Sequence, residues 1–219
     1  AREFEHINNE VPWIEAIHHV SMDASEIRPR VIKTHMPLSQ LPFNDRAKYI
    51  YICRNPCDVC VSQYMFFSKG LLGRLTVPLR GWVDLFCRGV IQYGSWWDHV
   101  RGYWEVREQP NVLFLRYEDI VADRLAVTRQ VADFMGINLS DAEAQLCADH
   151  IGFDWMKENA DKFAPKMLKD AKQFIRKGKS GGSKETINEV QRHEIIDACK
   201  RGMEGSGFDF SLYDDGSSA

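Results

Sequence analysis

Two contrasting patterns of apolar and polar residues meet within residues 48–67. Residues 49–52 alternate aromatic and β-branched side chains, so residues 48–53 are predicted to form a strand buried on both faces. The run ends at the polar group 54–56, and the mixed residues that follow have helical spacing. A strand that leads through Arg54 into a helix N-terminus favours an anion such as phosphate, because a guanidinium meets free backbone N–H groups. An ordinary strand–helix corner with a surface Arg54 is the alternative.

Two more stretches, residues 30–35 and 112–115, predict short strands that also end in polar side chains. The first ends with Lys33 and His35, and the second leads into residues 117–119, whose two carboxylates suit the first turn of a helix. Helical stretches follow the strands, so we expect an α/β fold with a central parallel sheet flanked by helices. Ligands of such sheets bind at the carboxyl ends of the strands, where these polar residues lie.

The rest of the chain predicts helices within a single domain, residues 1–219. No internal repeat or linker divides it, and residues 214–219 are expected to form a flexible tail. Ser95 and Ser140 suit helix N-caps, and Gly136 suits a helix end. The expected helices cover residues 79–93, 96–104, 126–135, 141–150 and 188–203.

The composition is that of a soluble globular protein, with 44% hydrophobic and 27% charged residues in 219. A net charge of -3 does not support a broad nucleic-acid surface, so any anion site must be local. No apolar run approaches the ~20 residues that span a bilayer, and the chain does not begin with a signal-peptide pattern. We therefore expect a cytoplasmic protein with neither a nucleic-acid partner nor a membrane partner.

Six cysteines lie among apolar neighbours. Cys57 and Cys60 form a C-x-x-C pair, but no second pair completes a zinc site, and no metal site is visible. We interpret the cysteines as buried free thiols in a reducing compartment, with a redox or metal role as the alternative.

A second unusual stretch, residues 173–184, combines cations with glycines. Arg176 and Lys177 precede Gly178, and Lys179 and Lys184 follow it. A flexible backbone of this kind approaches a phosphate closely while the cations face it. A solvated loop is the alternative.

Five blocks of the chain together resemble the cytosolic sulfotransferases, which move a sulfuryl group from 3′-phosphoadenosine 5′-phosphosulfate (PAPS) to a hydroxyl or amine. The blocks occur in the family's order across nearly the whole chain. They are RVIKTHMP at 30–37, YICRN at 51–55 with Asp58, Val61 and Ser62, YGSW at 93–96, VLFL at 112–115 with YED at 117–119, and FIRKG at 174–178. The resemblance implies a sulfotransferase fold related to the P-loop kinases.

The resemblance also implies roles for individual residues. His35 corresponds to the catalytic base that takes the acceptor's proton, and Lys33 to the lysine that steadies the transferring sulfuryl group. The residues implied for the nucleotide are Arg54, Ser62, Arg176, Lys177 and Gly178 at the 3′-phosphate, with Tyr117, Phe153 and Phe174 at the adenine. Trp13 and His99 are implied for the acceptor pocket.

Several features depart from the family pattern. The family's first strand and 5′-phosphosulfate loop are expected upstream of Ala1, so we interpret the chain as N-terminally incomplete. A divergent form that does not bind the donor normally is the alternative. Gly152 stands where a hydroxyl residue is frequent, and residues 182–184 replace Asp-Trp-Lys. The dimer motif is altered over residues 184–193, which weighs against a homodimer formed through this motif.

The sequence therefore predicts a metal-free sulfotransferase that uses PAPS, releases 3′-phosphoadenosine 5′-phosphate (PAP) and acts on a small phenol, alcohol or amine. A non-catalytic relative that binds PAP or PAPS without turnover is the main alternative. A nucleotide kinase of similar topology is less favoured, because the sequence offers no identifiable magnesium carboxylate.

Overall fold

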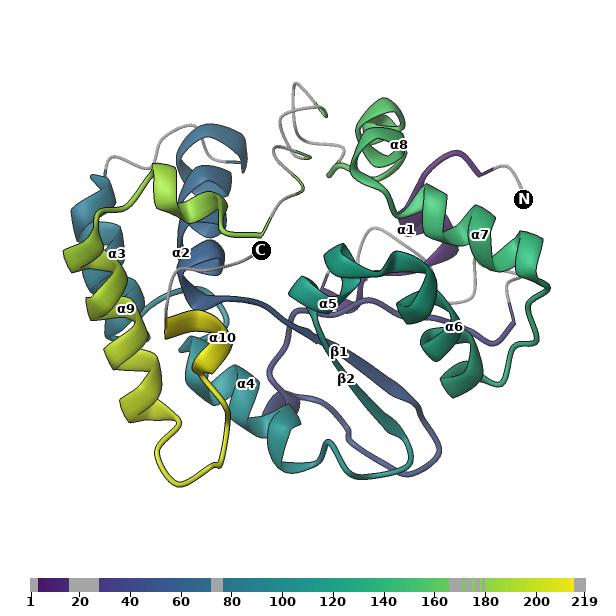
Figure 1. Ribbon diagram of the computed structural model, residues 1–219, viewed down its shortest axis with the longest axis horizontal. Coiled ribbons are helices and arrows are strands. Elements are labelled where there is room, and N and C mark those ends of the chain that lie inside the picture. Colours follow the sequence, from purple (N-terminus) through teal and green to yellow (C-terminus); the bar gives the residue numbers. More distant parts are fainter. Residues whose placement is uncertain are drawn as a thin grey trace.

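The computed structural model describes residues 4–15, 28–71, 77–165, 171, 175, 178 and 180–214, with the backbone alone at 69–71 and 214. Its sheet contains β1 (Tyr49–Cys53) and β2 (Val112–Arg116), which run parallel with Tyr49 opposite Val112. Helices flank this sheet (Figure 1). The predicted α/β architecture with a parallel sheet is therefore confirmed.

Helices lie on both sides of the two strands. Figure 1 draws α2, α3 and α9 on one side of the sheet and α6, α7 and α8 on the other. The α-helices are α1 (Ile7–Glu10), α2 (Pro56–Met65), α3 (Leu79–Cys87), α4 (Trp96–Glu105), α5 (Tyr117–Ala122), α6 (Arg124–Met135), α7 (Asp141–His150), α8 (Phe153–Glu158), α9 (Glu189–Gly202) and α10 (Ser211–Asp214). Short helices of other types are η2 (Leu38–Gln40), η3 (Phe66–Leu71), η4 (Ala160–Lys162) and η6 (Gly182–Glu185).

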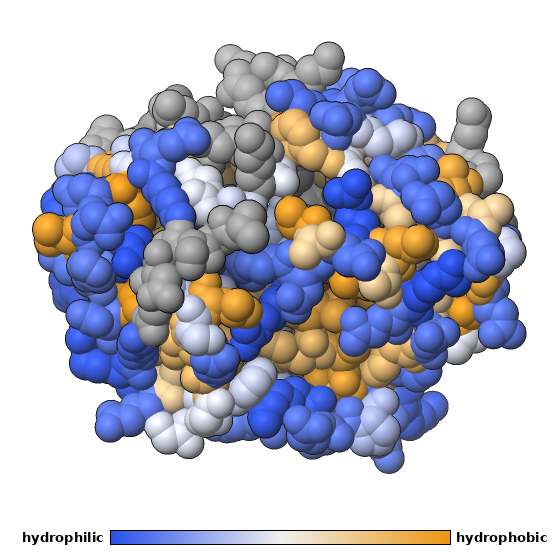
Figure 2. Space-filling view, in the orientation of Figure 1, coloured by the Kyte–Doolittle hydropathy of each residue, from blue (hydrophilic) through white to orange (hydrophobic). Residues whose placement is uncertain are grey.

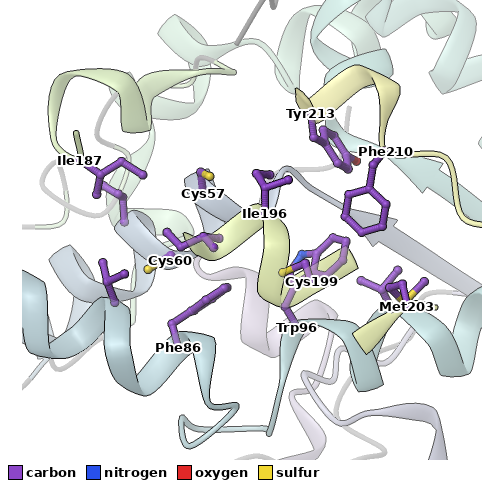
Figure 3. Packing of buried hydrophobic residues seen from close by; sticks show 14 of the residues in the cluster. Cys57, Cys60, Phe86, Trp96, Ile187, Ile196, Cys199, Met203, Phe210 and Tyr213 are labelled. Atoms are coloured by element: carbon purple, nitrogen blue, oxygen red, sulfur yellow. The ribbon is translucent and has the colours of Figure 1, made fainter. Parts of the chain in front are cut away.

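The main core lies between α2, α3 and α9, beside the end of β1. Cys57 and Cys60 on α2 face Ile196 and Cys199 on α9, and Phe86 on α3 packs beneath them (Figure 3). All five residues are at most 3% exposed. This packing anchors α2, so the loop between β1 and α2 is held from both sides.

The helix signals in the sequence are largely confirmed. The Ser95 hydroxyl accepts a hydrogen bond from the Asp98 N–H at 3.0 Å and so caps α4, and Ser140 caps α7. Gly136 ends α6 with a positive φ of 75°. However, α3 ends at Cys87 instead of continuing to residue 93.

Two strand predictions are wrong in detail. One face of β1 is not buried, because Ile50 is 42% and Ile52 is 52% exposed. Apolar side chains are visible in Figure 2 over the region where Figure 1 draws the two strands. Residues 30–35 form no strand of their own, and only Lys33 pairs, in a parallel bridge with Trp13. The neighbouring Pro12 has no N–H to extend the pairing.

The C-terminal prediction is partly wrong. Asp214 is the last residue of α10, and Tyr213 beside it is 1% exposed. Tyr213 therefore belongs to the core, and helix α10 reaches into the range predicted as a tail. Residues 215–219 lie outside the described residues.

The cysteine prediction holds for four of the six residues. Cys53, Cys57, Cys60 and Cys199 are buried free thiols, whereas Cys87 is half-buried and Cys147 is exposed. Burial raises the pKa of Cys53 and that of Cys57 to about 12, which makes both thiols unreactive at neutral pH. Within the described part of the chain, no group of potential ligands could hold a metal ion, and no helix could cross a membrane.

Candidate functional site

His35 and Lys33 lie on an extended segment that is paired to the chain around Trp13. The Lys33 N–H donates to the Pro12 carbonyl at 2.9 Å, and the Ile14 N–H donates to the Lys33 carbonyl at 3.0 Å. Lys33 Nζ lies 5.4 Å from the centre of the Trp13 ring. Alternate residues of an extended chain point the same way, so Lys33 and His35 share one side of the segment.

The His35 ring lies between two aromatic residues. The Trp13 ring meets it edge-on with centroids 5.1 Å apart, and Tyr93 stacks on it at 5.5 Å with an interplanar angle of 20°. Tyr93 is the one non-glycine residue with positive φ, 70°, in the described part of the chain. This backbone conformation is rare for residues other than glycine, and it is commonly retained where a side chain must point into a functional site.

His99, predicted to line the acceptor pocket, contacts the back of the His35 segment. Its Nε2 lies 3.0 Å from the His35 carbonyl oxygen, and its Nδ1 lies 3.0 Å from the Tyr51 hydroxyl. Both ring nitrogens therefore have protein partners that link α4 and β1 to residue 35. Contact with an acceptor remains a prediction for His99.

The local electrostatics favour a neutral imidazole at His35. Burial is the largest influence that lowers its pKa below the usual 6.5, and the Lys33 charge and His99 act in the same direction. The Glu15 carboxylate, 3.7 Å from Nδ1, opposes them. Burial likewise lowers the pKa of Lys33 from 10.5, against the attraction of Glu15. An unprotonated imidazole beside a cation suits proton removal next to developing negative charge. We call Trp13, Glu15, Lys33, His35 and Tyr93 the His35 centre.

A second centre forms where β1 meets α2. The Arg54 Nη2 donates to Asp58 Oδ2 at 3.1 Å, and the guanidinium carbon lies 4.2 Å from the centre of the Tyr117 ring. The Asn55 N–H donates to Glu118 Oε1 at 3.0 Å, and the Asn55 side chain caps α2. Parallel pairing of β1 and β2 brings these ends together, as predicted.

Asp58 ties this second centre to the glycine-rich loop. Its side chain is 1% exposed, and its two oxygens accept the N–H groups of Gly181 and Ser183, each at 2.9 Å. These partners lie 123 and 125 residues further along the chain. One buried carboxylate therefore holds Arg54 and the loop in a fixed relation. We call Arg54, Asp58 and Tyr117 with residues 181–183 the Arg54 centre.

Gly178 and Phe153, both predicted nucleotide residues, are in close contact. A Cβ added at Gly178 would lie 2.1 Å from Phe153 Cδ2, and Gly178 has a φ of 59°. Space and backbone conformation both require glycine at this position. The predicted contact of both residues with one nucleotide is compatible with their being neighbours.

The remaining predicted residues are placed less completely. Ser62 is exposed on α2, one turn after Asp58. Phe174, Arg176 and Lys177 lie outside the described residues. The described surface has hollows of about 580 Å³ beside Phe67 and Trp82, and about 500 Å³ between α3 and α9, and neither is lined by His35 or Lys33.

Three residues that contact the predicted site were assigned no role from the sequence: Glu15, Asp58 and Tyr93. Asp58 belonged to the matching block at residues 51–62, where it was given no function. Tyr93 belonged to a matching block without a stated function. Glu15 carried no signal except its position beside the apolar residues 11–14. All three contact residues that are distant in the sequence, and the pattern of apolar and polar residues does not reveal such contacts.

Comparison with known proteins gives one consistent family. Residues 2–207 match the family model described as the sulfotransferase domain. The chain is 33% identical to the 3-beta-hydroxysteroid sulfotransferase of Cavia porcellus over 201 residues, which are 89% of this chain and 70% of that protein. It is also 33% identical to sulfotransferase 1C2 of Oryctolagus cuniculus over 192 residues, which are 84% of this chain and 65% of that protein.

Solved structures give the same result. Mouse sulfotransferase SULT7A1 complexed with PAP matches with a TM-score of 0.71 and 29% identity, covering 80% of this chain and 66% of that one. A retinol dehydratase, in complex with androsterone and inactive cofactor PAP, matches with a TM-score of 0.75 and 29% identity. That match covers 85% of this chain and 57% of the other. The chain thus spans less than two thirds of the length of these solved relatives.

Proposed function

This chain belongs to the sulfotransferase family, as the sequence blocks predicted, and from this premise we propose that the whole protein transfers a sulfuryl group from PAPS to a small molecule. The observation that carries the proposal is the pair Lys33 and His35 on one side of an extended segment, where burial lowers the pKa of the imidazole. PAPS dependence and PAP release are attributed to this chain by analogy with relatives solved with PAP.

The proposed step is an in-line displacement at sulfur. The acceptor oxygen or nitrogen forms a bond to sulfur while the bond from sulfur to the 5′-phosphate oxygen breaks and PAP leaves with the electron pair. His35 takes the acceptor's proton, and Lys33 stabilises the negative charge that develops on the transferring group. A pKa below 6.5 keeps His35 able to accept a proton at neutral pH.

The Arg54 centre would bind the 3′-phosphate of the nucleotide. A guanidinium that is fixed by Asp58 and rests on Tyr117 is oriented before the phosphate arrives, which reduces the entropy lost on binding. Gly178 and Phe153 would contact the same nucleotide, as would Ser62 on α2. Phe174, Arg176 and Lys177 keep their proposed nucleotide roles from the family resemblance.

The acceptor is proposed as a small molecule with a hydroxyl or an amine. One relative, the 3-beta-hydroxysteroid sulfotransferase of Cavia porcellus, is named for a hydroxysteroid acceptor, and one solved relative is a retinol dehydratase. A phenol, an alcohol and a monoamine all fit the proposed step, and Trp13 and His99 remain the proposed neighbours of the acceptor.

Replacing the base tests the proposal. We expect His35→Ala in the full-length protein to abolish transfer of labelled sulfate from PAPS to a panel of phenols, alcohols and amines. We expect PAP affinity, measured by calorimetry, to stay within about twofold of the parent, because His35 lies outside the Arg54 centre.

An exposed histidine provides the matched control. His193→Ala, on the exposed surface of α9, is expected to leave transfer unchanged. Tight PAP binding without transfer by the parent protein would favour the non-catalytic alternative, and equal activity of the two variants would exclude His35 as the base.

A further inference from the structure

We propose that Glu15 is a positioning residue for His35. The Glu15 carboxylate fixes the backbone and the imidazole of His35, so that Nε2 is the nitrogen presented to the acceptor. This inference rests on the proposed function, because it treats His35 as the base. It adds a residue that the matching sequence blocks do not contain.

The carboxylate of Glu15 is bound to the His35 segment at two points. Its Oε1 accepts a hydrogen bond from the His35 backbone N–H, and it accepts another from the Thr34 hydroxyl at 3.2 Å. Thr34 Oγ1 in turn accepts the Met36 N–H at 3.0 Å. The side chain of Glu15 is only 13% exposed, so solvent competes weakly for these contacts. One carboxylate therefore sets the path of three consecutive residues around the base.

The two ring nitrogens of His35 differ in their surroundings. Nδ1 is buried, makes no hydrogen bond to another described residue, and lies 3.7 Å from Glu15 Oε1. The side chain as a whole is 41% exposed, so its accessible atoms lie away from Nδ1. The geometry leaves Nε2 as the nitrogen available to an incoming acceptor.

A carboxylate beside Nδ1 also selects the tautomer. Nδ1–H facing Glu15 is stabilised by the negative charge, and the lone pair then resides on Nε2. The separation of 3.7 Å exceeds a hydrogen bond, and catalytic hydrogen bonds commonly tighten only when the substrate is bound. Protonation during the reaction would place the positive charge of the imidazolium next to this carboxylate, which stabilises it.

The other groups that face the ring do not supply this effect. Lys33 and His99 both lower the pKa of His35, and the neutral Tyr93 ring stacks on its face. Glu15 is thus the charged neighbour among the described residues that favours the protonated ring. Its loss should make His35 a weaker base without removing the imidazole.

Nuclear magnetic resonance titration tests this inference without turnover. The chain has seven histidines, and the ring signal missing from His35→Asn identifies His35. In Glu15→Gln, which keeps the size of the side chain and removes its charge, we expect the His35 titration midpoint to fall below that of the parent. The acidic limb of kcat/KM should move to lower pH by the same amount, and kcat on the plateau should fall about tenfold.

Two further variants make the result specific. Glu5→Gln removes an exposed carboxylate from the same part of the chain and should leave the midpoint unchanged. Glu15→Asp retains the charge on a shorter side chain and should lower the His35 titration midpoint by a smaller amount. This variant also tests the inference if Glu15→Gln fails to fold. An unchanged midpoint in both Glu15 variants, with a native circular dichroism spectrum, would overturn the inference. If the parent protein shows no transfer activity but the His35 titration midpoint still falls in the Glu15 variants, the contact between Glu15 and His35 is supported and the proposed function is rejected.

Discussion

The Arg54 centre and the His35 centre each depend on one carboxylate, but the two carboxylates work in different surroundings. Asp58 is 1% exposed, sits in the first turn of a regular helix and binds a loop more than 120 residues away. Glu15 is 13% exposed and binds an extended segment 19 and 20 residues away, beside an imidazole that is 41% exposed. The Asp58 carboxylate is thus almost fully enclosed, whereas the imidazole beside Glu15 is partly open to solvent.

The difference fits the two tasks that we propose for these centres. A group that selects a phosphate benefits from a fixed position, because preorganised donors lose little entropy on binding. A group that removes a proton must contact an acceptor that enters and leaves, so part of its ring has to remain accessible. We therefore expect mutations of the Arg54 centre to change stability and nucleotide affinity, and mutations of the His35 centre to change rate and pH dependence.

The largest effect should follow from neutralising Asp58. Asp58→Asn replaces a buried anion that accepts three hydrogen bonds, so the free energy of unfolding should fall by about 3 kcal/mol. PAP affinity should fall on the order of 100-fold, because Arg54 and the loop lose their common partner. Urea denaturation and calorimetry measure the two effects.

The matched control is Asp84→Asn on α3. Asp84 also pairs with an arginine four residues away in the sequence, Arg80 at 2.8 Å, but this pair is about half exposed. Its loss should leave stability and PAP affinity near the parent values. Equal stabilities of the two variants would contradict a structural role for Asp58.

A smaller effect is expected from filling the space at Gly178. The Cβ of Gly178→Ala would overlap the Phe153 ring, and the φ of 59° adds backbone strain. We expect PAP affinity to fall about tenfold, equivalent to about 1.4 kcal/mol. In Gly136→Ala the backbone strain is similar, with φ of 75°, but nothing lies within 4 Å of the added Cβ. This control should keep the parent affinity, and a similar loss in both variants would show that contact with Phe153 is irrelevant.

The mildest perturbation is pH, and we expect its effect on the rate to reflect His35 and Lys33. Burial and Lys33 lower the pKa of His35, so the active neutral imidazole persists to a pH below 6.5. The rate should therefore rise with pH through a midpoint below 6.5. Burial also lowers the pKa of Lys33, so the rate should decline on the alkaline side with a midpoint below 10.5. A profile of kcat/KM across pH 4 to about 10.5 gives both limbs. A rising midpoint above 6.5 would contradict the neutral-base assignment.

The sequence identified the family, the two strands β1 and β2 and most helix ends, because these depend on short-range signals. Ser95, Ser140 and Gly136 act through hydrogen bonds or backbone angles within a few residues, and the matching blocks were contiguous. The sequence also placed Arg54 correctly at the junction of β1 and α2.

The contacts that hold the site residues follow from the tertiary structure and not from local sequence. The contact of Asp58 with residues 181–183 and that of Glu15 with residues 34 and 35 depend on how distant segments meet in space. The exposure of Ile50 and Ile52 likewise depends on which elements cover β1, although their apolar pattern is that of a buried strand. The periodicity of a sequence indicates which face of a helix or strand is apolar. Packing between elements far apart in the chain determines what covers that face, and it also determines which carboxylate contacts a given cation.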